Sequence, residues 1–315
     1  RENFGCGCSG GKFWRKGKAV QMALWALGDF HLSLQTPDKT MDRFGKVWVN
    51  HEIRIRENCE KLVRPSDTLV ITGDHSWGRK LTECGEDLDF IAGLPGRKIL
   101  LRGNHDAFWD VKKTEQLNVK YKGRLEFLQN NFYTYNEYAL VGTKGYCFEN
   151  LDSFEHFLKI QERETQRLRM SFEAARKAGF RKYIVFLHYP PTSCIWPPTD
   201  ELCAAAGMSA REQKILRKQQ DMIRMKRGGA DSGGNIVLDL HRLSPILQRK
   251  VSSVTQILHS PFTDMAEEYG AEQVIYSHSH GRERFDDSLK GTFSGILYRL
   301  VSGDYLNFVP EKLLD

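Results

Sequence analysis

The sequence has no uncharged hydrophobic run long enough to cross a membrane and no apolar segment near its N-terminus of the kind found in secretory signals. Its 7 cysteines are scattered without a framework spacing, so we expect reduced thiols and a reducing compartment. These absences argue against a membrane-spanning protein and against a disulfide-stabilised secreted domain. We expect a cytoplasmic protein, or an organellar one if the N-terminal residues are the remnant of a targeting segment.

Most of the chain also lacks a net positive charge. The formal net charge of +6 is concentrated in residues 1–18 and 211–227, and the remaining residues are slightly acidic together. Basic proteins often bind nucleic acid, but here the basic residues lie in a tail and in one internal segment. The charge therefore does not predict a basic active site, and we do not expect nucleic acid as the partner.

With 315 residues, 40% of them hydrophobic, the chain has enough apolar material for a large α/β domain. Short apolar runs end at glycine or polar residues, and helical patterns over 46–62 and 154–178 lie between several of them. The predicted strands are Ala23–Leu27, Thr68–Thr72, Lys98–Arg102, Tyr183–Leu187 and Gln273–Tyr276. This alternation predicts an α/β layered domain.

Three other segments have their own character. Residues 1–21 show no periodicity and are predicted to form a flexible basic tail, so the folded domain is expected over 22–315. Residues 192–262 interrupt the α/β pattern and are predicted to be an insertion, with a basic amphipathic helix around 210–227 and a second amphipathic segment from 236 to about 258. We expect the insertion to pack on the domain, and a protein partner or a role in capping the active-site cleft stays open. The alternating aromatic run Phe132–Tyr138 predicts a strand of a second sheet.

Metal-ligating residue types follow the predicted strands. Since the carboxyl ends of parallel strands lie at one edge of a sheet, these side chains are expected to lie close together. The groups are Asp29-Phe30-His31, Gly73-Asp74, Gly103-Asn104-His105-Asp106, His188 and His278-Ser279-His280. Chance rarely produces such a cluster, and packing gives no reason for it.

Carboxylate oxygens and neutral imidazoles suit Mn, Fe, Zn or Co, and the absence of paired cysteines argues against a structural zinc site. Asp29 and His31 are two residues apart, as are His278 and His280, so each pair can point the same way. Two ions about 3.5–4 Å apart need a bridging carboxylate, and Asp74 is the natural candidate. The sequence therefore predicts a dinuclear centre that activates a hydroxide for attack on phosphorus.

In their order, these motifs resemble the calcineurin-like metallophosphoesterase superfamily, and more narrowly a little-characterised group of bacterial-type metallophosphoesterases. The resemblance runs from Met22 through Pro310 except for the insertion. It implies a four-layer α-β-β-α sandwich of two mixed sheets, with the metal site on strand-end loops. The chain departs from the family pattern at Ser277, where glycine is usual, at His75, where an apolar residue is usual, and in the long insertion.

The resemblance also assigns roles. It implies one metal held by Asp29, His31, Asp74 and His280, and a second held by Asp74, Asn104, His188 and His278. His105 would protonate the leaving oxygen and Asp106 would orient its imidazole. Arg102 would either grip phosphate or form a salt bridge at the strand end. His75 is a candidate for supporting the site from behind.

The predicted function is that of a hydrolase: metal-dependent cleavage of phosphomonoesters or phosphodiesters by attack of a metal-bridging hydroxide. We expect two divalent ions, manganese first, with Fe, Zn, Co or Mg as the others. The Asp-Arg-Gly that marks the superfamily's protein phosphatases is absent after the second motif, so a Ser/Thr phosphatase is not predicted. The alternatives are a nuclease or a cyclic-nucleotide phosphodiesterase, and a non-catalytic scaffold that retains the fold.

Overall fold

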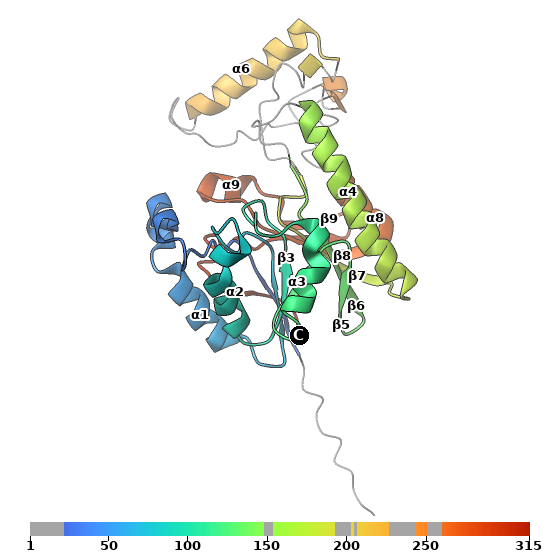
Figure 1. The fold of residues 1–315 in the computed structure, drawn as a ribbon. Coiled ribbons are helices and arrows are strands. Elements are labelled where there is room, and N and C mark those ends of the chain that lie inside the picture. The colour runs from blue at the N-terminus through green and yellow to red at the C-terminus, as the bar shows by residue number, and fades with distance from the viewer. Residues whose placement is uncertain are drawn as a thin grey trace, which may run out of the picture.

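Two β-sheets pack face to face and helices cover the outer face of each, as the computed structural model shows (Figure 1). The structure describes residues 22–147, 154–192, 203–204, 207–226, 244–247, 249–250 and 260–315. The four-layer α-β-β-α arrangement predicted from the sequence is therefore confirmed.

The first sheet has five strands in the order β11-β1-β2-β3-β4. Strands β1 to β4 are parallel, and β11 runs antiparallel to β1. Their bounds are Leu24–Leu27 (β1), Thr68–Ile71 (β2), Arg97–Leu101 (β3), Glu126–Leu128 (β4) and Glu311–Leu314 (β11). The carboxyl ends of β1, β2 and β3 thus lie at one edge.

The second sheet has six strands in the order β5-β6-β7-β8-β10-β9. Strands β6, β7, β8 and β10 are parallel, while β5 and β9 are antiparallel edge strands. Their bounds are Phe132–Tyr135 (β5), Tyr138–Thr143 (β6), Lys182–Leu187 (β7), Ala271–Tyr276 (β8), Gly291–Phe293 (β9) and Ile296–Leu300 (β10). The five strands predicted from apolar runs are all present in the two sheets, as β1, β2, β3, β7 and β8.

Helices fall into two outer layers. The first sheet carries α1 (His51–Leu62), α2 (Gly85–Gly93) and α3 (Thr114–Lys120). The second carries α4 (Phe154–Lys177) and α8 (Pro261–Tyr269), while the short α9 (Arg282–Asp287) follows β8. The loops of the first half of the chain contain short 3₁₀ turns of three or four residues: η1 (Pro37–Lys39), η2 (Met41–Phe44), η3 (Lys46–Trp48), η4 (Leu81–Glu83) and η5 (Val111–Lys113). Within the described part of the chain, no helix is both long and apolar enough to cross a membrane.

Alternation along the strands explains the layering. On β1, Trp25 and Leu27 pack toward the helices of the first layer, while Leu24 and Ala26 pack between the sheets. The apolar cluster between the sheets includes Phe186 of β7, and the cluster under α4 and α8 forms the outer core of the second sheet. Both faces of each sheet are therefore buried, which is why the central strands are continuous apolar runs.

Two predicted elements differ in the structure. The helix predicted over 46–62 is split into η3 and α1, because Asn50 between them has a positive φ of 51°. The aromatic run Phe132–Tyr138 was predicted as one strand, but it is a hairpin in which Asn136 turns the chain with φ 49°. Asparagine tolerates this left-handed conformation better than most residues, so each break occurs where the local chemistry permits it.

The insertion is described only in part. Its helix α6 (Ala210–Lys226) agrees closely with the predicted helix over 210–227 and is set apart from the two sheets (Figure 1). Lys250 donates to Glu212 at 3.0 Å, and Leu216 is buried. Most of the amphipathic segment predicted over 236–258 and the whole tail 1–21 lie outside the described residues.

Asp67 anchors the first sheet at the end opposite the strand-end loops. Its buried carboxylate accepts hydrogen bonds from the backbone N–H of Ala23 and Arg64, both at 2.9 Å, and from the Trp25 indole at 3.1 Å. Burial alone would raise the pKa of Asp67, but these three donors outweigh it and lower the pKa below its ordinary value.

We predict that Asp67→Ala lowers the free energy of unfolding by about 2–3 kcal/mol, because buried donors lose their acceptor. In the wild-type protein, ionised Asp67 adds to the free energy of unfolding at pH values above about 4, the ordinary carboxyl pKa. This stabilisation is lost as the pH falls through the lowered pKa that Asp67 has in the folded protein. Urea denaturation at several pH values measures both effects. The exposed Asp42→Ala is the control and should change stability by less than about 0.5 kcal/mol; equal stability of the two variants would contradict the prediction.

Candidate metal centre

Loops from the two sheets converge at the carboxyl ends of the central strands. Glycines allow this approach: a Cβ at Gly28 would overlap Thr72 and Ser277, and one at Gly103 would overlap the Asp74 carboxylate. Ser277, the departure from the family pattern, donates from its hydroxyl to the Thr72 carbonyl at 2.9 Å. It therefore ties the end of β8 to the end of β2.

The backbone is strained where the polar side chains leave it. Positive φ angles occur at Asp29 (56°), His31 (43°), Asp74 (53°) and His278 (70°). Non-glycine residues rarely adopt this region, and such strain gathers at functional sites. The surrounding hydrogen bonds hold it: the Asp29 carboxylate, for example, accepts from the His278 backbone N–H at 3.1 Å.

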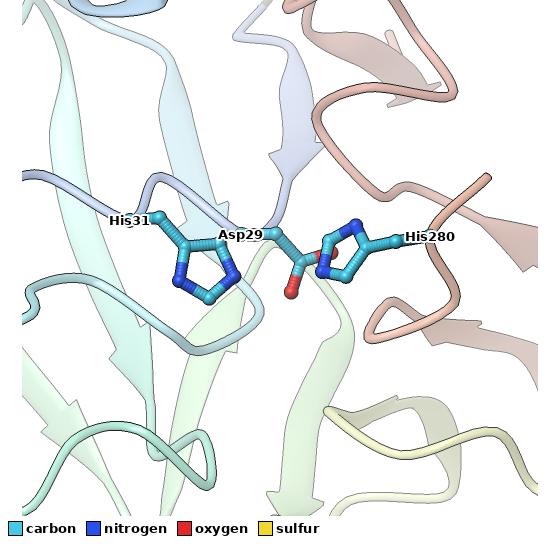
Figure 2. Close-up of side chains that lie close together, drawn as sticks. All are labelled: Asp29, His31 and His280. Carbon is cyan, nitrogen blue, oxygen red and sulfur yellow. The ribbon is translucent and has the colours of Figure 1, made fainter. Parts of the chain in front are cut away.

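The side chains form two clusters, each with its ligand atoms within 4.8 Å of one another. One cluster comprises Asp29, His31 and His280, which point toward one another in Figure 2 from the loops after β1 and β8. The other comprises Asp74, His188 and His278.

Asp74 faces both clusters. Its Oδ2 atom lies 3.4 Å from His188 Nε2 in its own cluster and 3.6 Å from His31 Nε2 in the other. Asn104 joins the second cluster, with its Oδ1 atom 2.6 Å from His188 Nε2. The structure thus brings together all seven residues predicted as metal ligands.

Several atoms in this centre are buried without a hydrogen-bond partner. They are both ring nitrogens of His31 and the Oδ2 atom of Asp74. Buried polar atoms are normally paired, so unpaired ones at a cluster of imidazoles and carboxylates fit a site for divalent cations. The donor set of carboxylates, imidazoles and one amide suits Mn, Fe, Zn or Co.

The protonation states of His31 and Asp74 suit metal binding. Burial lowers the pKa of His31 well below its ordinary value, so its imidazole is neutral. For Asp74, burial acts to raise the pKa, but the nearby charge of His188 outweighs it and holds the pKa well below its usual range. A neutral imidazole and an ionised carboxylate are the forms that bind a metal.

Two histidines are oriented by acceptors behind them. His280 Nδ1 lies 2.9 Å from Asp304 Oδ1, and His188 Nδ1 lies 2.9 Å from the Thr72 carbonyl. Each contact uses Nδ1, so the acceptor lies behind the ring and Nε2 is the nitrogen on the far side, the usual arrangement behind a metal-bound histidine. Burial opposes protonation of His280, but the carboxylates of Asp29 and Asp304 raise its pKa to about 9. Sequence reasoning missed Asp304, although it follows strand β10 as the other site residues follow theirs.

His105 lies at the edge of the centre. Its backbone N–H donates to Asp74 Oδ1 at 2.8 Å. Its ring centroid is 4.4 Å from that of Trp77 and 5.4 Å from that of His31. The ring is half-buried and borders the cavity beside the centre, where a leaving group can reach it.

Asp106 does not orient His105 as the sequence predicted. Its buried carboxylate contacts His75 Nδ1 at 2.8 Å and accepts backbone N–H bonds from Asp74, His75 and Gly103. These four contacts occupy both oxygens, so the side chain points behind the loops instead of toward the cavity. Asp106 therefore holds the β2 and β3 loops together, and His75 supports the site from behind, as its position suggested.

Arg102 lies beside the centre with another partner. Its Nε donates to the Trp109 carbonyl at 2.7 Å, and no carboxylate pairs with it among the described residues. It does not border the cavity next to the metal centre. The predicted strand-end salt bridge is thus absent from the described chain, and the phosphate contact stays a prediction.

A cavity of about 520 Å³ opens beside the centre. Asp74, His31, His105, His278 and His280 line it on the metal side. Apolar side chains from η2, η3 and the β2 loop line another side, and the sequence did not predict them as site residues.

The calcineurin-like phosphoesterase family model matches residues 22–282. The chain belongs to this family. Calcineurin-like phosphoesterases are metal-dependent phosphoester hydrolases that use divalent ions, and this member has the aspartate and histidine clusters that such ions need. The predicted family is confirmed.

The solved structures that match this chain are distant from it in sequence. A phosphopantetheinyl hydrolase from Mycobacterium tuberculosis is 12% identical, covers 93% of this chain and 95% of its own, and has a TM-score of 0.45. A Thermus thermophilus protein is 8% identical, with 93% and 98% covered and a TM-score of 0.43. A protein of unknown function from Aquifex aeolicus is 22% identical, with 60% and 88% covered and a TM-score of 0.32. No curated protein matches the chain.

We predict that divalent ions stabilise this phosphoesterase, because they compensate the buried carboxylates and the unpaired atoms of His31. At Mn²⁺ one hundred times above its dissociation constant, the free energy of unfolding should rise by about 2.7 kcal/mol for each site. Thermal unfolding with Mn²⁺ and with a chelator measures this. Asp42→Asn, an exposed control, should keep the full shift, and identical midpoints in chelator and Mn²⁺ would contradict a metal centre.

We further predict that Asp304→Ala weakens Mn²⁺ binding at the cluster that contains His280 by about 10-fold to 100-fold, because His280 loses the acceptor that orients its ring. Calorimetric titration of the metal-free protein with Mn²⁺ resolves the two sites. Asp286→Ala, an exposed aspartate of α9, is the matched control and should leave both affinities unchanged. Unchanged affinities in Asp304→Ala would show that the contact has no role in metal binding.

Proposed function

We propose that this protein is a dinuclear phosphoesterase that hydrolyses a phosphomonoester or a phosphodiester. The observation that carries the proposal is the position of Asp74, whose Oδ2 atom lies within 3.6 Å of an imidazole from each ligand cluster. A carboxylate between two ligand sets is what a pair of divalent ions requires as a bridge. Family membership supports the same reaction class.

Two divalent ions, manganese first among Mn, Fe, Zn, Co and Mg, would lower the pKa of water and neutralise charge on the phosphoryl oxygens. The chain's own residues supply the rest. Asp29, His31 and His280 form one binding set and Asp74, Asn104, His188 and His278 the other. Their loops are held by Asp106, Asp304 and Ser277, so the sets are preorganised around the position of the phosphoryl group.

His105 is the proposed general acid. As the bond between phosphorus and the leaving oxygen breaks, the His105 imidazolium gives its proton to that oxygen, so the product leaves as a neutral alcohol. Its backbone bond to Asp74 fixes the distance between acid and metal ligands. The His105 ring packs against the rings of Trp77 and His31, and these contacts orient it instead of the carboxylate that the sequence predicted.

We predict that the Mn²⁺-loaded enzyme hydrolyses an aryl phosphomonoester, an aryl phosphodiester or both, and that His105→Ala reduces kcat by about 10²-fold to 10⁴-fold. Assays with and without Mn²⁺ on both esters measure this, and the preferred ester decides between phosphatase and phosphodiesterase. His156→Ala, an exposed histidine of α4, should retain full activity. Full activity of His105→Ala would remove it from the mechanism, and two bound ions without turnover of either ester would favour a scaffold.

We predict that Asp74→Asn abolishes turnover, because an amide cannot balance two cations as a carboxylate does. Metal content measured alongside activity separates loss of an ion from loss of chemistry. Asp42→Asn, exposed on η2, is the control that should keep both. Substantial turnover by Asp74→Asn with two ions bound would contradict the bridging role.

A further inference from the structure

The cavity beside the metal centre has two unlike sides. One side carries the imidazoles and the Asp74 carboxylate, and the adjoining side carries Met41, Phe44, Val47, Trp48 and Trp77. A phosphoryl group gains nothing from indole and phenyl surfaces, since its oxygens need charge and hydrogen-bond donors. The apolar side, which we call the aromatic wall, therefore faces the organic part of a phosphoester.

The inner part of the aromatic wall is fixed to the metal centre. The Trp77 ring stacks on His31, with centroids 5.1 Å apart and an angle of 28° between the planes. Trp48 is buried and makes edge contacts with His31 at 5.7 Å and His280 at 5.4 Å. Both indoles thus touch predicted metal ligands, so a group bound to the wall lies next to the reacting phosphorus.

The outer part of the aromatic wall contains a large apolar side chain, Phe44, that is exposed to solvent. Phe44 of η2 is 59% exposed, and the Arg43 guanidinium lies over its ring at 5.0 Å from the centroid. An exposed phenylalanine that borders a cavity is an available binding surface. Because it belongs to a short turn and contributes little to the core, it can be removed without unfolding the domain.

The size and charge of the cavity restrict the occupant. About 520 Å³ is the volume of a typical small-ligand pocket. Among its lining residues in the described chain, Arg284 is the one lysine or arginine. Nucleic acid binding needs several cations along a groove, so this cavity favours a small molecule with an apolar group over a polynucleotide.

We propose that the substrate carries a planar aromatic or heteroaromatic group, and that this ring binds against Phe44, Trp48 and Trp77 while the phosphoryl group lies at the ligand clusters. The proposal rests on the proposed phosphoesterase function and specifies its substrate class. Planar rings are favoured over saturated ones because stacked and edge-to-face contacts with aromatic side chains add to the burial of apolar area. Specificity then resides in turns η2 and η3 and in Trp77 of the β2 loop, and not in the metal ligands themselves.

Non-hydrolysable phosphonates test the wall without turnover. Calorimetry of the Mn²⁺-loaded protein with 2-phenylethylphosphonate and propylphosphonate should show about tenfold or more tighter binding of the aromatic compound. Phe44→Ala should reduce that preference by about threefold or more. Phe293→Ala, which removes a phenylalanine of similar exposure on β9, is the matched control and should keep the preference.

The outcomes separate this inference from the proposed function. Equal affinity for the two phosphonates, or equal affinity for 2-phenylethylphosphonate and 2-cyclohexylethylphosphonate, overturns the aromatic wall even if the enzyme is active. An unchanged preference in Phe44→Ala also overturns it. If neither aryl ester is hydrolysed while the phosphonate preference is present, the proposed function fails and the aromatic binding site stands.

Discussion

Two buried carboxylates, Asp29 and Asp74, meet where the strand-end loops of both sheets converge, and their negative charge has to be balanced there. Burial raises the pKa of Asp29, whereas the neighbouring His188 imidazole holds the pKa of Asp74 well below its ordinary value despite its burial. A protein interior stabilises such a group only with opposite charge close by. The imidazoles supply part of that charge, and divalent cations would supply the rest, so the centre is built for ions.

The remaining structure keeps these groups in place. Parallel strands bring the loops to one edge of each sheet. Glycines in these loops let the backbones lie so close together that a Cβ atom at a glycine position would overlap the neighbouring loop. The Asp106 carboxylate accepts hydrogen bonds from three backbone N–H groups and contacts the His75 imidazole. These contacts hold the β2 loop against the β3 loop. Four of the ligand residues have positive φ angles, which strain the backbone. The fold can keep this strain because the surrounding hydrogen bonds fix the conformation of the loops.

Strands and ligands could be predicted from the sequence because each motif is local: an apolar run followed at once by Asp, Asn or His. The partner of Asp106 could not, since His75 and His105 are both plausible neighbours until the loops are folded. Asn50 and Asn136 broke predicted elements because a single left-handed residue leaves no mark on hydrophobic periodicity. The place of Phe44 and Trp48 at the cavity could not be predicted either, because they lie on 3₁₀ turns and meet Trp77 only in the folded chain.

The central claim is that Asp74 bridges two ions. Anomalous diffraction from crystals of the Mn²⁺-loaded protein tests it most directly. The account predicts two manganese peaks about 3.5–4 Å apart, one beside Asp29, His31 and His280 and the other beside Asn104, His188 and His278, with Asp74 in contact with both. A single peak, or two peaks that do not share Asp74, would contradict it.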